Sequence, residues 1–276
     1  MRIDAHQHFW LYDSQRDAWI TEEMSTIRRN FLPNDISHTL KNNHFDGAVA
    51  VQADQSHQET RFLVELAQVY KMIKGVVGWV DLRSPQVEQY LADFAQNDII
   101  KGFRHIVEGE QDADFLTTDE FQNGISQLTK YGFTYDLLIH PRHYASTLAC
   151  VRANPTQKFM LDHMAKPAIR TQEYADWALF IEELSSYANV YCKVSGLATE
   201  ADWSNYHVAQ FEPYIHHVIS CFGKNRICFG SDWPVCLLAA SYEQSLQIVA
   251  ENLHDFTTEE LDMFWGINAS KFYNLK

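Results

Sequence analysis

The 276-residue sequence lacks paired cysteines, a glycine-rich phosphate loop, a long apolar run and an excess of basic residues. Its five cysteines are scattered and odd in number, which indicates neither a disulfide framework nor a cysteine-based metal site. We therefore expect reduced, mostly buried thiols. No apolar run is long enough to span a bilayer, and no basic N-terminus leads into an apolar signal segment. These absences predict a cytoplasmic protein.

The charge balance is acidic, with 22 Lys and Arg residues against 36 Asp and Glu residues and a formal net charge of −14. A surface of this sign argues against nucleic acid or an anionic membrane as a partner. It leaves a small-molecule substrate as the expected ligand, since a local site can differ in sign from the whole surface. It says nothing about the oligomeric state.

Short apolar, β-branched runs alternate with amphipathic stretches along the whole chain, and 46% of the residues are hydrophobic. The runs predict eight strands, at 2–6, 47–52, 75–80, 99–104, 134–140, 158–162, 190–195 and 226–230. The amphipathic stretches predict helices at 35–42, 60–70, 86–95, 118–131 and 211–222, and two more around 177–184 and 242–253. No linker or repeat interrupts this order, so residues 1–276 are expected to form one domain.

Alternating strands and helices are typical of an α/β fold with parallel strands and right-handed crossovers. Eight strands in this length favour a closed (β/α)₈ TIM barrel. A doubly wound open sheet is the alternative, weakened because no glycine-rich loop follows any predicted strand.

Polar residues collect where the predicted strands end. In a barrel, the C-terminal ends of all strands converge on one mouth, so these side chains are expected to lie near each other. In strand order they are His6 and His8, Gln52, Trp79 and Asp81, Arg104 and His105, His140 and Arg142, Asp162 and His163, Ser195, and Asp232.

His6 and His8 are two residues apart in a strand, so both imidazoles point to the same side. With His163 and Asp232 at other strand ends, they offer three imidazoles and one carboxylate, a set that suits one divalent ion, zinc above all. The alternative is a metal-free hydrogen-bonded network of the same four residues.

The stretch "RICFGSDWPV" (226–235) runs from an apolar strand into a glycine, an acid and a proline. Glycine permits a tight turn, and proline prevents a helix from continuing there. We expect this turn to aim Asp232 into the mouth, with Trp233 as a wall of the pocket. A cap of the next helix is the alternative role for Asp232.

The motifs "IDAHQHFW", "KGFRH", "LDHMAKP", "KVSGL" and "FGSDWPV" resemble those of the amidohydrolase superfamily, in the amidohydrolase-2 branch of sugar-acid lactonases. The resemblance continues to the terminal "NASKFYNL" and implies a distorted TIM barrel. It also implies His6, His8, His163 and Asp232 as metal ligands. The strand-4 lysine that bridges two metals in binuclear members is absent, and Arg104 and His105 occupy that region. One metal at most is therefore expected.

The resemblance implies that activated water opens a sugar lactone such as L-fuconolactone or L-rhamnonolactone. Asp232, with His163, would be catalytic, Asp232 moving the proton from water to the ring oxygen. The expected substrate contacts are Gln52, Arg104, His105, His140, Arg142 and Trp233. A metal would polarise the carbonyl, or His and Arg donors would do so without one.

The sequence does not assign a role to two lysines. For Lys166 the sequence leaves two roles open, a structural pair with Asp162 or a contact with the substrate. Lys193, inside a strand, has no predicted direction. Two other functions remain open: a decarboxylase of the same superfamily acting on an acidic aromatic substrate, and a non-catalytic sugar-binding barrel.

Overall fold

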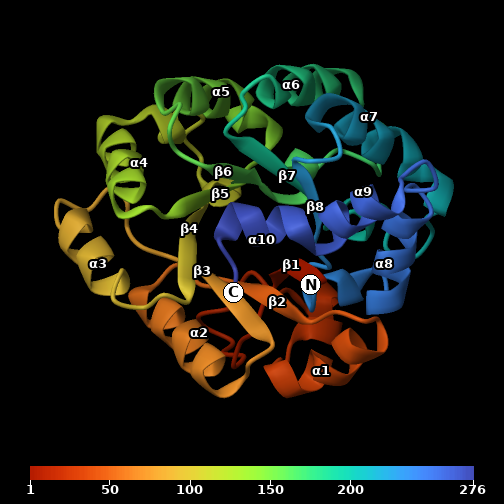
Figure 1. The fold of residues 1–276 in the computed structure, drawn as a ribbon, viewed down its shortest axis with the longest axis horizontal. Helices are drawn as coiled ribbons and strands as arrows, with labels where there is room; N and C mark the ends of the chain where they lie inside the picture. The colour runs from red at the N-terminus through yellow and green to blue at the C-terminus, as the bar shows by residue number, and fades with distance from the viewer.

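The computed structural model describes residues 1–276, and its eight parallel strands form one sheet in the order β1 to β8 (Figure 1). The strands are β1 (Ile3–Gln7), β2 (Gly47–Val51), β3 (Ile73–Gly78), β4 (Ile100–Ile106), β5 (Thr134–Leu138), β6 (Phe159–Leu161), β7 (Val190–Val194) and β8 (Ile227–Phe229). The helices are α1 (Pro33–Asn42), α2 (His57–Val69), α3 (Val87–Phe94), α4 (Asp119–Tyr131), α5 (Tyr144–Ala153), α6 (Ala175–Ser185), α7 (Glu212–Phe222), α8 (Tyr242–Ala250), α9 (Thr258–Asp262) and α10 (Asn268–Tyr273).

The predicted (β/α)₈ barrel is confirmed, and each of the eight predicted strands overlaps an observed one. Parallel ladders join every pair from β1–β2 to β7–β8, with a shift of register in each of the first three pairs. The ring closes differently, because β1 pairs with the segment that follows β8. His8 N donates to Trp233 O at 2.7 Å, and Asp232 N donates to His6 O at 3.0 Å. The barrel is therefore distorted at the seam that carries four of the expected site residues, His6, His8, Asp232 and Trp233.

Two hydrophobic cores flank the barrel wall. The larger core fills the space between the strands and the surrounding helices. The smaller one lies inside the barrel, where Ile3, Val49 and Val77 pack against Phe272 and Tyr273 of α10. Figure 1 shows α10 lying across the centre of the strand ring. Since α10 closes the N-terminal end of the barrel, a ligand can reach the strand-end residues only from the opposite end.

Seven helices match the predicted ones, but α5, α9 and α10 were missed. The α5 stretch, "YASTLACVRA", mixes small and β-branched residues and has weak apolar periodicity. Between α9 and α10, Met263–Ile267 forms a π-helical turn. The wider π turn shifts the register of the apolar positions, so the 3.6-residue period is lost across it.

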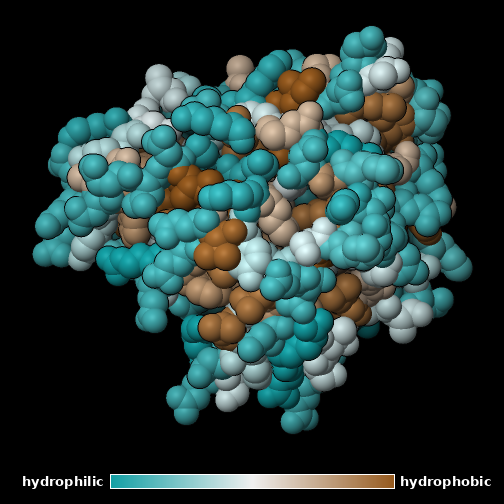
Figure 2. All heavy atoms as spheres, turned by 60° about the horizontal axis from the view of Figure 1, so that its bottom comes forward, coloured by the Kyte–Doolittle hydropathy of each residue, from teal (hydrophilic) through white to brown (hydrophobic).

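The surface and the thiols agree with the composition. Four of the five cysteines are buried, the fifth is half-buried, and all are free, which confirms the expected reduced thiols. The face seen in Figure 2 is mostly hydrophilic, with hydrophobic residues in separate patches. None of the helices has the length and apolar character needed to cross a membrane.

Glu59, in the first turn of α2, predicts a pH dependence of stability. Its side chain is buried and accepts a hydrogen bond from Ala53 N at 3.0 Å, and burial raises its pKa from 4.5 to about 7. The folded state then keeps a proton that the unfolded state loses, so stability falls as pH rises from 4.5 towards 7.

We expect Glu59→Gln, which keeps the acceptor without the charge, to match the parent at pH 5. At pH 8 its free energy of unfolding should be higher by about 2 kcal/mol. Urea denaturation across this range measures the difference. Glu65→Gln, on the exposed face of the same helix, is the control, and a parallel pH dependence of parent and Glu59→Gln would contradict the assignment.

Candidate active site

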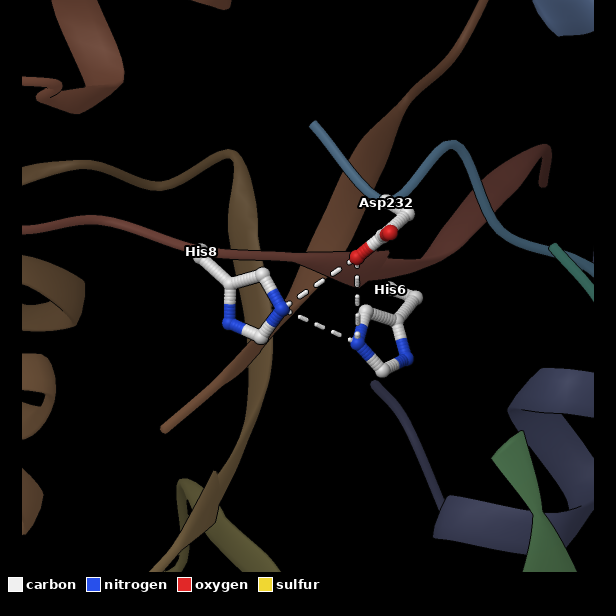
Figure 3. A group of neighbouring side chains, drawn as sticks. All are labelled: His6, His8 and Asp232. Atoms are coloured by element: carbon white, nitrogen blue, oxygen red, sulfur yellow. Dashed lines mark hydrogen bonds and ion pairs between the residues drawn. The ribbon is translucent and has the colours of Figure 1, made fainter. Parts of the chain in front are cut away.

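His6 and His8 leave the end of β1 on the same side and meet Asp232 from the segment after β8 (Figure 3). The Nε2 atoms of the two imidazoles are 3.1 Å apart. Asp232 Oδ1 lies 3.4 Å from His8 Nε2 and 3.7 Å from His6 Nε2. The predicted pairing of the two histidines with the strand-8 aspartate is therefore present in the structure.

His163, directly after β6, joins the same group. Its Nε2 is 3.9 Å from Asp232 Oδ1, and its ring centroid is 4.4 Å from that of His6. All four side chains are buried. The predicted convergence of His6, His8, His163 and Asp232 at one end of the barrel is confirmed.

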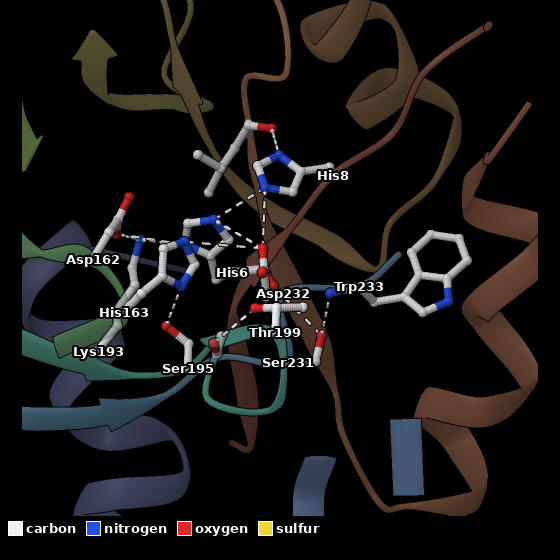
Figure 4. A network of polar contacts seen from close by, with 12 residues as sticks. His6, His8, Asp162, His163, Lys193, Ser195, Thr199, Ser231, Asp232 and Trp233 are labelled. Carbon is white, nitrogen blue, oxygen red and sulfur yellow. Dashed lines mark hydrogen bonds and ion pairs between the residues drawn. The ribbon is translucent and has the colours of Figure 1, made fainter. Parts of the chain in front are cut away.

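The second nitrogen of each imidazole has its own partner, which fixes the ring (Figure 4). His8 Nδ1 donates to Val51 O at 2.8 Å, and His163 Nδ1 lies 2.9 Å from Ser195 Oγ. His6 Nδ1 is 3.4 Å from the carboxylate of Asp162. Burial lowers the pKa of His6 and of His163, so both are neutral near pH 7. Neutral imidazoles with oriented rings are the form that ligates metals.

The donor set fits a divalent metal ion. His6, His8 and Asp232 form one group of ligand atoms within 4.8 Å of one another, and His6, Asp162 and His163 form a second that shares His6. Imidazole nitrogens with a carboxylate oxygen suit zinc. The same geometry also accommodates a metal-free network, because Arg104 Nη1 lies 3.3 Å from His6 Nε2 and can donate to it.

Asp232 owes its position to its own backbone and to a buried acid on β1. Its φ is 59°, a left-handed backbone conformation that residues other than glycine rarely adopt. Asp4 accepts hydrogen bonds from Ser231 N at 2.8 Å and from Tyr242 OH at 3.1 Å, which holds the turn against β1. Gly230 was expected to permit a tight turn, but its role is to leave room for His6. A Cβ at position 230 would lie 2.7 Å from the Cβ of His6.

Asp232 is a carboxylate in this setting. Burial by itself would raise its pKa, but the imidazoles of His163, His8 and His6 hold that pKa below its usual value. A buried carboxylate beside oriented imidazoles can ligate a metal or accept a proton from water.

His163 begins a left-handed turn of four residues, His163 to Lys166, with φ between 51° and 60°. Such a run is strained and persists only where its surroundings impose it. Trp177 Nε1 donates to Met164 O at 2.6 Å, and Gly196 leaves room for the His163 ring, since a Cβ there would lie 2.6 Å from His163 Nδ1. The turn places His163 and Lys166 on the same cavity.

A cavity of about 520 Å³ opens over these residues, a size typical of small-molecule sites. His8, His163, Asp232, Arg104 and His140 line it, as sequence analysis predicted for the mouth. Its wall also contains Trp10, Trp19, Met24, Glu108, Lys166, Thr199, Glu200 and Trp203.

Four of the expected substrate contacts lie outside this lining. Gln52 binds the Arg104 guanidinium through its side-chain oxygen at 3.1 Å, and His105 is 2.7 Å from Glu110. The Arg142 guanidinium is exposed and donates to a backbone oxygen. The Trp233 ring packs in the core against Phe9 and Phe31 and points away from the imidazoles (Figure 4). The expected place of Trp233 in the pocket wall is therefore not seen.

Lys166 does not pair with Asp162, which was one of the two roles that the sequence left open for it. Lys166 Nζ lies 2.7 Å from Glu108 and 3.5 Å from Glu200, both on the cavity wall. Sequence reasoning missed these two glutamates because it stopped at the first polar residues after each strand. Glu108 comes two residues after β4 ends, within a short 3₁₀ turn, and Glu200 ends a similar turn beyond β7.

Asp162 pairs instead with Lys193, whose direction the sequence left open. Lys193 Nζ is 3.0 Å from Asp162, 2.6 Å from Asp136 and 3.3 Å from His6 Nδ1, and all three charged side chains are fully buried. Arg104 donates to the other oxygen of Asp162 at 3.0 Å. Burial opposes the charge on Asp162, but Lys193, His6 and Arg104 hold its pKa well below the usual value.

Comparison with known proteins places this geometry in a family. A sequence model of the protein family described as "Amidohydrolase" (Amidohydro_2) matches residues 3–275. An L-fucono-1,5-lactonase of Burkholderia multivorans is 34% identical over 286 residues, covering 100% of this chain and 96% of the relative. An L-rhamnono-gamma-lactonase of Scheffersomyces stipitis is 26% identical, covering 74% of this chain and 70% of the relative.

A crystal structure of an amidohydrolase from Burkholderia multivorans with bound Zn superposes with a TM-score of 0.97. It is 34% identical to this chain, and the alignment covers 100% of both chains.

Removing Lys193 should destabilise the protein strongly. Lys193→Met keeps the length of the side chain but leaves Asp136 and Asp162 without their shared cation. Breaking a buried ion pair in this way costs about 3 kcal/mol or more. Urea denaturation measures the loss. Lys130→Met, which breaks an exposed pair with Glu88, is the matched control and should have no measurable effect. Equal stability of both variants would contradict the assignment.

Proposed function

This chain belongs to the Amidohydrolase family, and we propose that it is a lactonase that opens an aldono-lactone of a deoxy sugar, such as L-fuconolactone or L-rhamnonolactone. One observation carries the proposal: the imidazoles of His8 and His163 and the carboxylate of Asp232 line a cavity that is large enough for a monosaccharide ring, with the His6 imidazole buried directly behind them. The lactonase names of the two relatives support the same reaction and the choice of deoxy sugar.

Hydrolysis of a lactone needs a base for water, stabilisation of the carbonyl oxygen and an acid for the ring oxygen. Asp232 accepts a proton from the attacking water, whose oxygen bonds to the carbonyl carbon. When the bond from that carbon to the ring oxygen breaks, the same proton passes from Asp232 to the ring oxygen. The products are a hydroxyl group and a carboxylic acid, so one carboxyl group serves both proton transfers.

His6, His8 and His163 would hold one divalent ion with Asp232. When bound, this ion supplies Lewis acidity for the carbonyl oxygen. The partners of Nδ1 keep each imidazole aimed at the shared point, whether or not the ion is present. Arg104 adds a fixed positive charge beside His6, since Asp162 and Gln52 hold its guanidinium in place. That charge favours the oxyanion that develops at the carbonyl.

The test is a panel of aldono-lactones assayed by acid release. Conversion of L-fuconolactone or L-rhamnonolactone supports the proposal. The decarboxylase alternative predicts no acid release from lactones but loss of carbon dioxide from acidic aromatics. A non-catalytic sugar-binding barrel predicts binding without turnover.

Asp232→Asn should remove nearly all turnover while the fold remains. Asn keeps the size of the side chain but cannot accept the proton, so kcat should fall by about 10²-fold or more. Circular dichroism and metal content would show whether fold and metal are retained. Asp81→Asn, a half-exposed aspartate after β3 and outside the cavity, is the control. Turnover of Asp232→Asn within a few-fold of the parent would place the base elsewhere.

The metal can be tested separately from the reaction. Dialysis against a chelator should lower the rate by about 10²-fold, and added zinc should restore it. Metal analysis before and after dialysis provides the reference. An unchanged rate in protein shown to be metal-free would favour the metal-free network of His6, His8, His163 and Asp232, with Arg104 donating to His6, and the lactonase proposal would stand without the ion.

A further inference from the structure

Three charged side chains from three different strand ends line the same cavity as the candidate catalytic residues. Glu108 follows β4, Lys166 follows β6 and Glu200 follows β7. Lys166 lies between the two carboxylates, at 2.7 Å and 3.5 Å. Each of the three side chains keeps about a fifth of its area exposed. They are therefore held in place by one another and still accessible to a ligand in the cavity.

The charges of this wall do not balance. Two carboxylates surround one ammonium group, which leaves one negative charge in excess. His140, 3.8 Å from Glu108, does not offset it, because burial lowers the pKa of that imidazole and keeps it neutral. The nearest other cation on the lining, Arg104, is already committed to Asp162.

We infer that Glu108, Lys166 and Glu200 form a recognition wall that selects an uncharged, hydroxyl-bearing lactone and excludes one that carries a carboxylate. This inference rests on the proposed lactonase function. Hydroxyl groups can donate to the free lone pairs of the two carboxylates and accept from Lys166. A carboxylate on the substrate would meet like charges and would have to displace a glutamate from the only ammonium group on the wall.

The wall replaces part of the recognition set that the sequence suggested. Gln52 and Arg142, expected to bind hydroxyl groups, do not line the cavity. Gln52 contacts Arg104, and the Arg142 guanidinium donates to the backbone oxygen of Glu108. Charged residues that bind hydroxyl groups discriminate strongly, because a ligand without those groups leaves them desolvated and unpaired. The indoles of Trp10, Trp19 and Trp203 line the same cavity and offer apolar surface to a ring face or a methyl group.

Three lactones test the wall by turnover: an aldono-1,5-lactone, its aldaro counterpart with a terminal carboxylate, and unsubstituted δ-valerolactone. The parent should prefer the aldono-lactone over the other two by about 10²-fold in kcat/KM. Glu200→Gln and Glu108→Gln should narrow the preference over the aldaro-lactone by about tenfold, since the excess negative charge is removed. Glu88→Gln, which breaks the exposed pair with Lys130, is the matched control and should change neither ratio.

A binding measurement separates this inference from the lactonase proposal. Titration calorimetry with hydrolysis-resistant lactams, one with a neutral terminus and one with a carboxylate, reports on the wall without turnover. The parent should bind the neutral lactam more tightly than the carboxylate lactam, and this difference in affinity should be smaller in Glu200→Gln. That result supports the inference even if no lactone is hydrolysed. Three results would overturn the inference. The ratio of the two lactam affinities could be the same in the parent and in Glu200→Gln, the variant could lose the same affinity for every ligand, or the parent could bind neither lactam.

Discussion

The buried ammonium group of Lys193 is the constraint on which the interior of this barrel depends. It pairs with Asp136 and Asp162, two fully buried carboxylates that need close partners, and Arg104 supplies a second positive charge to Asp162. On the side of α10, Tyr273 donates to Asp136 at 2.7 Å. On the side of the site, His6 and Arg104 contact Asp162. One chain of polar contacts therefore links the helix that closes the barrel to the imidazole at the centre of the site.

The seam of the barrel gives the site its second constraint. Because β1 pairs with the segment after β8, the contact that closes the ring also brings Asp232 beside His6 and His8. Asp4 holds that segment through Ser231 and Tyr242. The segment that closes the barrel therefore also places Asp232 beside His6 and His8, and its hydrogen bonds hold Asp232 at a strained φ.

The sequence predicted the features that depend on short repeating patterns of apolar and polar residues. Alternation and apolar runs located eight strands, and the polar residues at their ends included His6, His8, His163 and Asp232. Pairings between distant segments were not readable in the same way. Nothing local distinguishes Lys193 from Lys166 as the partner of Asp162, because the choice depends on which side chain faces the barrel interior. The π turn before α10 likewise hid the helix that supplies Tyr273.

The two parts of the cavity are supported by different kinds of structure. His6, His8 and Asp232 come from the closing seam, where backbone hydrogen bonds join β1 to the segment after β8. Glu108 and Glu200 lie on short turns beyond the strands and contact Lys166 rather than the Lys193 cluster. The wall can therefore change without loss of the buried ion pairs. Loops carried on a rigid barrel can vary in this way while the chemistry beneath them stays fixed.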